Sequence, residues 1–410
     1  MTNLRRSLLL SLPPMFLLGG VAVARVGGDT APSHVQLTSS PAGPGARFPT
    51  LARSQDGRIA MIWSEKGADS VTQVRVSVRD ASGQWSSPST VVRDTSLLVN
   101  FADVPRIAWL SRNELAVTWL KRGGPGRYDY GVRVARSNDA GRSWQRLAPP
   151  HDSTEAGEHG FVSLVPLSNA RFAMTFLNGH SHGTPGGGTQ VVMTEYDAKG
   201  ERARTLPLDT RACDCCQTAA TVSSRGVLVV YRDRTQDEIR DISITREVNG
   251  KWTDPAPVSK DRWKIGGCPV NGPAISSDAQ RVVVAWFTGA RDTAKVQVAF
   301  SNDGGVTFGA PMRSVGGAPA GHVDVLMQTN GSAIVSWLER GEGDKLSVRL
   351  RRVSPNRTTS TPVVLGEVQG IRPTGWPSIV ENNSGVLVAW TVPGSPARIQ
   401  LQQVSKVALQ

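Results

Sequence analysis

Short apolar segments that end in an aromatic residue recur along the chain at a nearly constant spacing. The seven segments are Ile59–Trp63, Leu115–Trp119, Arg171–Phe176, Val227–Tyr231, Val282–Trp286, Ala333–Trp337 and Val386–Trp390. Their closing aromatic residues follow one another at intervals of 56, 57, 55, 55, 51 and 53 residues. Another apolar stretch and a polar turn precede each segment, and apolar and polar residues alternate after it, as in Val74–Val78. Alternation with period two, rich in Val and Thr, is typical of β-strands, so each repeat predicts three or four strands.

Repeats of this length and strand content predict an all-β protein, a β-propeller in which each repeat is one blade. We expect seven four-stranded blades, or six if one repeat is degenerate. The last repeat has no clear outer strand after Val404, and the segment His34–Thr38 is expected to supply that strand and close the ring. Residues 25–410 would then form a single domain.

The first 24 residues have the pattern of a secretory signal peptide. Arg5 and Arg6 precede a mostly apolar run, Leu8–Ala24, that ends in small residues. We therefore expect cleavage near Ala24 and a secreted or periplasmic protein. No later segment is apolar enough to predict a membrane span.

The chain is basic, with a formal charge of +12, and loss of the two signal arginines leaves 12 − 2 = +10. The Lys and Arg residues are spread along the sequence without a basic run or a nucleic-acid-binding module, so a nucleic-acid partner is not expected. The excess charge either keeps a monomer soluble or lines a positive cleft for an anionic ligand.

Two turns share the pattern Ser-x-Asp-x-Gly-x-x-aromatic. They are built from Ser137, Asp139, Gly141 and Trp144, and from Ser301, Asp303, Gly305 and Phe308. These turns resemble the Asp-boxes, or BNR repeats, of the sialidase (neuraminidase) superfamily of propellers. In such a turn the Asp and Gly hold a tight bend and the aromatic residue packs between blades, which is a structural role.

Loops that precede the inner strands, and loops that follow the second strands, should meet at one mouth of the ring. Such loops on a rigid scaffold usually carry function. The residues expected there are Arg47, Asp103, His159, Cys213–Gln217, Cys268–Asn271, His322, Asp324 and Arg372–Trp376 from the first set, and Glu65, Tyr128, Tyr130, His180, His182, Arg232–Asp241, Arg291, Asp292, Glu339 and Arg340 from the second.

All four cysteines belong to this predicted mouth. In an exported protein an even number of cysteines suggests disulfides, and a Cys213–Cys268 bridge would join the fourth and fifth blades. Metal binding is the alternative, because thiolates together with imidazoles suit copper(I) or zinc. The candidate ligands are Cys213, Cys215, Cys216, Cys268, His159, His322, His180 and His182.

The sialidase resemblance implies a set of site residues. That family holds a sialic acid carboxylate with three arginines and uses a Tyr–Glu nucleophile with an Asp as acid/base; guanidinium forks match carboxylates well. Arg47-Phe48-Pro49 is similar to the family's Arg-Ile-Pro stretch. Further arginine candidates are Arg232, Arg234, Arg291 and Arg372, and the carboxylate candidates for catalysis are Asp103, Asp233 and Glu238.

Three functions remain open from the sequence. The leading hypothesis is an exported sialidase-like propeller that binds, and as an exo-sialidase-like glycoside hydrolase could cleave, an anionic glycan at its axial mouth. The second is a copper- or zinc-binding envelope protein that uses the Cys/His cluster. The third is a propeller without catalysis that binds a protein partner on the same face.

Overall fold

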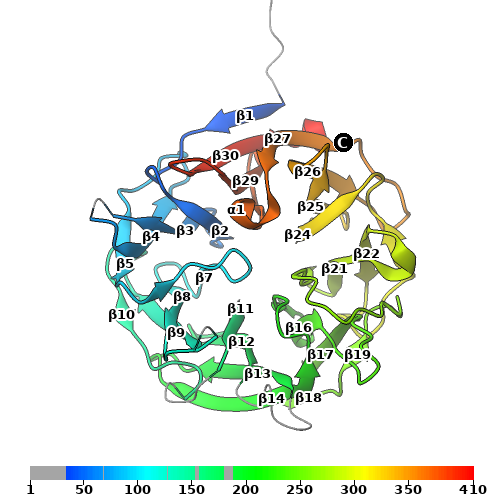
Figure 1. Cartoon of the computed structure of the whole chain (residues 1–410), viewed down its shortest axis with the longest axis horizontal. Helices are drawn as coiled ribbons and strands as arrows, with labels where there is room; N and C mark the ends of the chain where they lie inside the picture. The colour runs from blue at the N-terminus through cyan, green and yellow to red at the C-terminus, as the bar shows by residue number, and fades with distance from the viewer. Residues whose placement is uncertain (1–33, 68, 127, 153–156, 180–187) are drawn as a thin grey trace, which may run out of the picture. The chain divides into compact units, whose positions relative to one another are not determined.

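A computed structural model describes residues 34–410 except 68, 127, 153–156 and 180–187. The expected signal peptide therefore lies outside the described residues, as do His180 and His182. Within the described residues nearly all regular structure is strand, arranged as seven small antiparallel sheets around a ring (Figure 1). No helix in this part of the chain is long and apolar enough to cross a membrane.

The first three blades follow the chain in order from the inner strand outward. The first contains β2 (Arg47–Arg53), β3 (Ile59–Lys66), β4 (Thr72–Arg79) and β5 (Ser89–Arg93); the second β7 (Arg106–Trp109), β8 (Leu115–Arg122), β9 (Tyr130–Ser137) and β10 (Gln145–Arg146), with β6 (Leu97–Leu98) also paired to β8; the third β11 (His159–Pro166), β12 (Phe172–Asn178), β13 (Thr189–Tyr196) and β14 (Arg202–Ala212).

The next three blades repeat this order. The fourth contains β15 (Ala219–Ser223), β16 (Gly226–Arg232), β17 (Ile242–Val248) and β18 (Lys251–Trp252), with β19 (Ala256–Pro257) also on β17; the fifth β20 (Ala274–Asp278), β21 (Arg281–Thr288), β22 (Lys295–Ser301) and β23 (Met312–Arg313); the sixth β24 (Pro319–Met327), β25 (Ala333–Arg340), β26 (Lys345–Val353) and β27 (Val363–Gln369). In the described part of the chain, three single turns of helix interrupt the strands: η1 (Ala290–Asp292), α1 (Ile371–Thr374) and η2 (Val407–Leu409).

The seventh blade joins the two ends of the ring. It contains β28 (Ser378–Asn382), β29 (Gly385–Val392), β30 (Arg398–Ser405) and, as its outer strand, β1 (Val35–Thr38). β1 pairs antiparallel to β30, with Val35 opposite Val404 and Thr38 opposite Leu401. The prediction of seven blades closed by an N-terminal strand is therefore confirmed, and the six-blade alternative is wrong.

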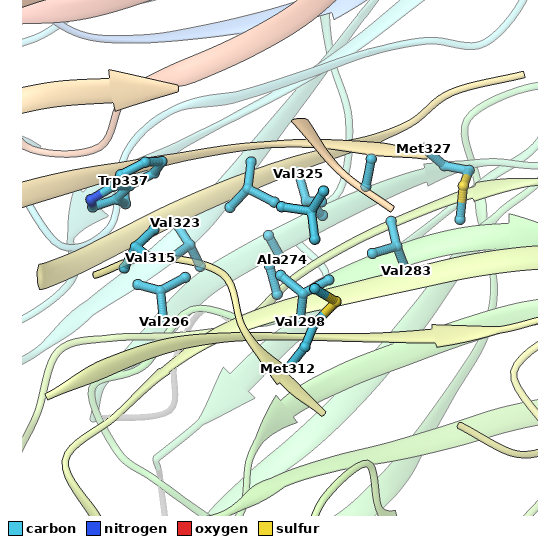
Figure 2. Close-up of a cluster of buried hydrophobic side chains, with 14 residues drawn as sticks. Ala274, Val283, Val296, Val298, Met312, Val315, Val323, Val325, Met327 and Trp337 are labelled. Carbon is cyan, nitrogen blue, oxygen red and sulfur yellow. The ribbon is translucent and has the colours of Figure 1, made fainter. Parts of the chain in front are cut away.

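The core lies between neighbouring blades, because each sheet buries both of its faces. Figure 2 shows one such layer, in which Val296 and Val298 of the fifth blade pack with Val323, Val325 and Trp337 of the sixth. All seven closing aromatic residues are buried, at most 4% exposed. The indole N–H of Trp337 donates to Glu339 at 2.7 Å. Glu339 is therefore part of the frame rather than a mouth ligand.

The two Ser-x-Asp-x-Gly turns are held by the same hydrogen bonds. Asp139 accepts from the backbone N–H of Arg142 and Ser143, both at 2.9 Å, and Asp303 repeats this with Val306 and Thr307 at 3.0 Å. The serine hydroxyl of each turn accepts the glycine N–H. Burial alone would raise the pKa of Asp139, but the hydrogen bonds that it accepts from Ser143, Ser137 and Arg142 outweigh burial and lower that pKa to about 2. The indole N–H of Trp144 donates to Ser89 of the neighbouring blade at 3.0 Å.

Three inner strands begin with a bulge at the mouth of the ring. The register of β2, β11 and β24 shifts there, and Phe48, Phe161 and His322 have φ values of 58°, 58° and 54°. A positive φ is uncommon for residues other than glycine, and bulges often border functional sites because they redirect side chains.

Candidate functional site at the mouth of the ring

Two adjoining cavities open at the predicted mouth. The first, the tyrosine cavity, has a volume of about 720 Å³ and is lined by residues that include Ala102, Arg122, Tyr128, Tyr130, Glu158, Asp214, Cys215 and Cys268. The second, the arginine cavity, measures about 590 Å³ and is lined by residues that include Arg47, Phe48, Glu65, Lys66 and Pro396. Phe101 and Arg372 line both cavities, so the two adjoin at these side chains and are together called the hollow.

The exposed charges of this hollow are mainly positive. Arg47, Lys66, Arg122 and Arg372 are exposed, and the guanidinium of Arg372 lies 5.6 Å from the ring centre of Phe101. Among the described residues, none of these four cations forms an ion pair with a carboxylate. The mouth therefore presents several basic groups to an incoming ligand, and Arg47 and Arg372, proposed as ligand-binding residues from the sequence, share one cavity.

The acidic groups at the surface of the hollow are engaged by other side chains. Glu65 accepts the indole N–H of Trp63 at 2.7 Å and lies 3.4 Å from Arg75. Asp214 pairs with Arg234 at 2.8 Å. These bonds reduce the negative charge that an anionic ligand would meet.

A tyrosine and a glutamate meet at the surface of the tyrosine cavity. The Tyr130 hydroxyl, on the first residue of β9, donates a hydrogen bond to Glu158, which directly precedes β11. Burial, followed by the negative charges of Asp103 and Glu158, raises the pKa of Tyr130 well above its usual range. The sequence placed Tyr130 at the mouth but did not reveal this pairing, because no motif links Tyr130 to Glu158 and the two belong to different blades.

Asp103 does not line the tyrosine cavity, whereas Tyr130 and Glu158 do. It is 3% exposed, and its carboxylate accepts the backbone N–H of Phe161 at 2.6 Å. Burial is the main cause that raises the pKa of Asp103 to about 7. Tyr130 is nearly as buried, at 4% exposed, but it and Glu158 line the cavity and Asp103 does not. The expectation that Asp103 is the acid in contact with substrate is therefore corrected: Asp103 acts on the pair through its charge beside Tyr130.

Arg232 is a structural residue, contrary to the prediction that it binds ligand. Its side chain is 1% exposed and donates to the carbonyl oxygens of Asn271, Arg240 and Phe287 at 2.9, 2.7 and 2.7 Å. The guanidinium also lies 4.9 Å from the ring centre of Trp263. Because the side chain is buried and two of its acceptors, Asn271 and Phe287, belong to the fifth repeat, Arg232 ties the fourth blade to the fifth.

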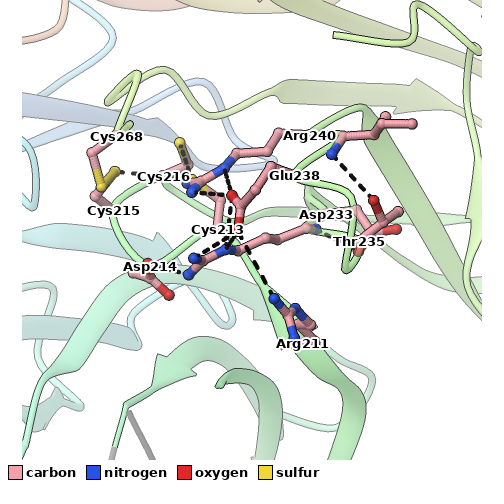
Figure 3. A network of polar contacts seen from close by, with 12 residues as sticks. Arg211, Cys213, Asp214, Cys215, Cys216, Asp233, Thr235, Glu238, Arg240 and Cys268 are labelled. Atoms are coloured by element: carbon pink, nitrogen blue, oxygen red, sulfur yellow. Dashed lines mark hydrogen bonds and ion pairs between the residues drawn. A yellow bond between two sulfur atoms is a disulfide. The ribbon is translucent and has the colours of Figure 1, made fainter. Parts of the chain in front are cut away.

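Glu238 is paired with arginine side chains and is therefore not available as a catalytic base (Figure 3). Arg234 and Arg240 donate to it at 2.9 and 2.8 Å, and Arg211 lies 3.9 Å away. The hydrogen bonds from Arg234 are the main cause that lowers the pKa of Glu238 to about 2. Arg234 and Glu238 neutralise one another beside the tyrosine cavity, so neither is placed as the sequence suggested.

Two further candidates lie outside both cavities. Asp233 accepts hydrogen bonds from the backbone N–H of Arg234 and from the Ser243 hydroxyl, at 2.6 and 3.0 Å, within the fourth blade. Arg291 is exposed in η1 of the fifth blade and does not line either cavity.

The cysteines form a different bridge from the one considered first. Cys215, not Cys213, is joined to Cys268, and the disulfide links the loops before β15 and β20. Cys213 and Cys216 are free and buried. The sulfurs of Cys213, Cys215 and Cys216 lie within 4.8 Å of one another, as a metal site would need, but the disulfide removes two of the four expected thiolates.

The two described histidines among the expected metal ligands pack elsewhere. His159 is buried and stacks on His151, with ring centres 4.1 Å apart. His322 stacks on Trp376 at the same distance, and its Nδ1 lies 2.6 Å from the carbonyl oxygen of Gly375. Burial lowers the pKa of His322 to about 4. Both rings serve the packing of the inner strands in this structure.

Comparisons with known proteins identify the fold and not a family. The sequence matches no protein-family model, and no curated protein matches it either. An ulvan lyase of polysaccharide lyase family PL25 has a TM-score of 0.57 at 11% identity, covering 90% of this chain and 96% of that one. The polysaccharide lyase Uly1 has a TM-score of 0.53 at 9% identity, covering 88% and 90%.

A sialidase is also among the similar structures. The Hadza microbial sialidase Hz136 has a TM-score of 0.43 at 15% identity, covering 72% of this chain and 63% of that one, a likeness too distant to support an argument. The chain is therefore a seven-bladed β-propeller that shares its fold with polysaccharide-degrading enzymes. A specific place in the sialidase superfamily stays a prediction.

Proposed function

We propose that this protein binds an acidic polysaccharide across the tyrosine and arginine cavities. The observation that carries the proposal is that the two cavities adjoin and are lined by four exposed cations that have no carboxylate partner among the described residues: Arg47, Lys66, Arg122 and Arg372. Guanidinium groups bind carboxylates and sulfates through paired hydrogen bonds, and cations lining one cleft attract anionic ligands.

The shape of the hollow favours a chain of sugars over a single one. Phe101 and Arg372 lie where the cavities of about 590 and 720 Å³ meet, so a ligand that fills both must pass over them. Tyr128 is 58% exposed and lines the tyrosine cavity. Flat aromatic faces of this kind suit the apolar faces of sugar rings, while the arginines would hold the acidic groups.

The structural comparisons support a ligand of this class. One structure of the PL25 ulvan lyase, with a TM-score of 0.56, contains a glucuronate–sulfated rhamnose unit, which is an acidic sugar pair. An expected secretory signal also fits a polysaccharide met outside the cytoplasm. The shared fold supports the type of ligand only, because the residues of the site must supply the specificity.

The Tyr130–Glu158 pair favours cleavage as a second, dependent proposal. As Tyr130 approaches a sugar carbon, Glu158 can take its hydroxyl proton, so the pair can act as an activated nucleophile or as a proton relay. Burial, and then the charges of Asp103 and Glu158, keep the pKa of Tyr130 high. Asp103 therefore acts on the reacting hydroxyl only through Tyr130, as a positioning residue.

Binding is tested by calorimetry with ulvan oligosaccharides, oligogalacturonate and sialyllactose, and with a neutral xylo-oligosaccharide as control. We expect at least one acidic ligand to bind, more weakly at high salt, and Arg372→Ala to weaken it about 5- to 30-fold, equivalent to about 1–2 kcal/mol. Arg291→Ala is the matched control and should bind as the unaltered protein does. Failure of every acidic ligand to bind would refute the proposal. So would an affinity in both Arg372→Ala and Arg47→Ala that equals that of the unaltered protein.

Cleavage is tested separately on any ligand that binds. Release of a reducing end indicates hydrolysis, and a new ultraviolet absorbance from an unsaturated uronate indicates elimination. Tyr130→Phe should abolish either product while leaving affinity within about threefold, because only the reacting hydroxyl is removed. Turnover that survives in Tyr130→Phe would contradict the assigned role, and binding without any turnover would leave a binding protein.

A further inference from the structure

The disulfide of this protein lies at the surface of the tyrosine cavity. Cys215 and Cys268 both line that cavity, Cys268 is exposed, and Cys215 is half-buried. The bridge spans 53 residues and holds the fourth blade to the fifth at the mouth of the ring. The disulfide therefore joins, by a covalent bond, the two loops that form that side of the cavity.

Two free thiols lie directly behind this bridge (Figure 3). The sulfur of Cys213 is 3.9 Å from that of Cys215 and 3.1 Å from that of Cys216. Cys213 and Cys216 are 0% and 1% exposed. Solvent thiols and oxidants cannot reach them without local opening, whereas the neighbouring disulfide is in contact range.

The surroundings of Cys213 favour its thiolate, which is the form that attacks a disulfide. The guanidinium of Arg240 donates a hydrogen bond to the sulfur of Cys213 at 3.3 Å, and a cation in contact with a sulfur stabilises its charged form. Cys216 lies 3.1 Å from the same sulfur and is buried, so it is the second thiol within reach of the exchange.

We propose that the four cysteines form an internal thiol–disulfide exchange centre that moves the bridge from the cavity surface to the buried pair. In the first step the Cys213 thiolate attacks the sulfur of Cys215; a Cys213–Cys215 bond forms, the Cys215–Cys268 bond breaks, and Cys268 leaves as a thiolate. In the second step Cys216 attacks Cys213 and releases Cys215, and the proton of Cys216 passes to Cys268. One disulfide and two thiols are present before and after, so no oxidant or reductant is consumed.

The exchange changes what the cavity presents. Afterwards Cys213 and Cys216 form a disulfide within one loop, the tie between the two blades is gone, and Cys215 and Cys268 are thiols at the cavity surface. The centre thus gives this mouth two covalent states. The inference does not depend on glycan binding, and its test requires no ligand.

The experiment traps the outward thiols with N-ethylmaleimide in the native, unreduced protein. Trypsin places Cys213, Cys215 and Cys216 in the peptide 212–225 and Cys268 in the peptide 265–281. Before exchange these peptides are cross-linked. After exchange they separate: 212–225 carries an internal disulfide and one maleimide on Cys215, and 265–281 carries one maleimide on Cys268. We expect labelling of Cys268 to accumulate with time, because alkylation prevents the reverse reaction.

Two variants separate exchange from simple exposure. Cys213→Ser should keep the cross-link and slow labelling of Cys268 at least about tenfold, because the attacking thiolate is absent. Cys216→Ser should still lose the cross-link but stop at a Cys213–Cys215 disulfide, and it carries the test if Cys213→Ser fails to fold by circular dichroism. A cross-link that persists in the unaltered protein, equal labelling in Cys213→Ser, four oxidised sulfurs, or copper or zinc held by Cys213 and Cys216 with Cys268 unlabelled would each overturn the proposal.

Discussion

Replacement of Arg232 by alanine should destabilise the whole propeller. The change removes a buried cation that donates to three backbone carbonyl oxygens, those of Asn271, Arg240 and Phe287. A hydrogen bond to a charged group contributes about 1.5–3 kcal/mol, and buried acceptors left without donors incur a desolvation penalty. Water entering the space would satisfy part of that need, so we expect a net loss of about 3–5 kcal/mol.

The charge-conserving variant separates charge from geometry. Arg232→Lys keeps a cation but offers one ammonium in place of a planar fork, so it cannot reach three carbonyl oxygens in different directions. We expect it to lose about 1–3 kcal/mol and, once folded, to bind acidic glycans as the unaltered protein does. Arg291→Ala removes an exposed arginine from the adjoining blade and should change stability by no more than about 0.5 kcal/mol.

The assay is equilibrium unfolding in urea, followed by tryptophan fluorescence and by circular dichroism to establish that both report one transition. A free energy of unfolding for Arg232→Ala within about 1 kcal/mol of that of the unaltered protein would refute the structural role of Arg232, since three unmet carbonyl oxygens would cost more. A stable Arg232→Lys that no longer binds glycan would restore the ligand role that the structure argues against.

Three other predictions concern carboxyl groups, each measured by urea unfolding against the unaltered protein. Asp139→Ala should lose about 1–2 kcal/mol, because the N–H groups of Arg142 and Ser143 lose their acceptor; no loss would contradict the turn's structural role. The pKa of Glu238 is lowered from 4.5 to about 2, so the stabilisation that it contributes is present above pH 4.5 and is lost as the pH falls through about 2. Glu238→Gln should reduce the fall in the free energy of unfolding over this acidic range, and an unchanged fall would contradict the prediction. The pKa of Asp103 is raised from 3.8 to about 7, so its contribution to the free energy of unfolding is fully present below pH 3.8 and is lost as the pH rises through about 7. Asp103→Asn should remove this loss of stability, and a variant that loses as much stability over the same pH range would refute the raised pKa of Asp103.

The fold could be predicted from the sequence because the pattern that specifies it lies within each repeat and recurs along the chain. Each blade needs an apolar strand closed by a large residue, and Trp63, Trp286 and Trp390 mark such strands at matching positions. Because every sheet buries both of its faces, each of the seven blades requires this pattern. The pattern therefore remains recognisable even where a single repeat is irregular. The missing outer strand of the last repeat pointed in the same way to β1 at the other end of the chain.

The residues that meet at the mouth were predictable as a group, but their roles were not. A ring brings loops of equal phase to one face, which is why Arg47, Arg372 and the cysteines could be assigned there together. Pairing depends on distances of a few ångströms between blades, and no local pattern encodes these. Cys215 rather than Cys213 therefore meets Cys268, and Tyr130 meets Glu158.

The sequence alone determined a seven-fold β-propeller and the face on which its chemistry-bearing residues gather, because strand periodicity and repeat phase are properties of neighbouring residues. Only the tertiary structure decided which charged side chains are exposed to a ligand and which are buried against other parts of the protein. Arg232 and Arg372 look equivalent in the sequence, yet one is buried among carbonyl oxygens and the other is exposed over an open cavity. That difference arises from packing between blades, where burial and the available partners set the role of each side chain.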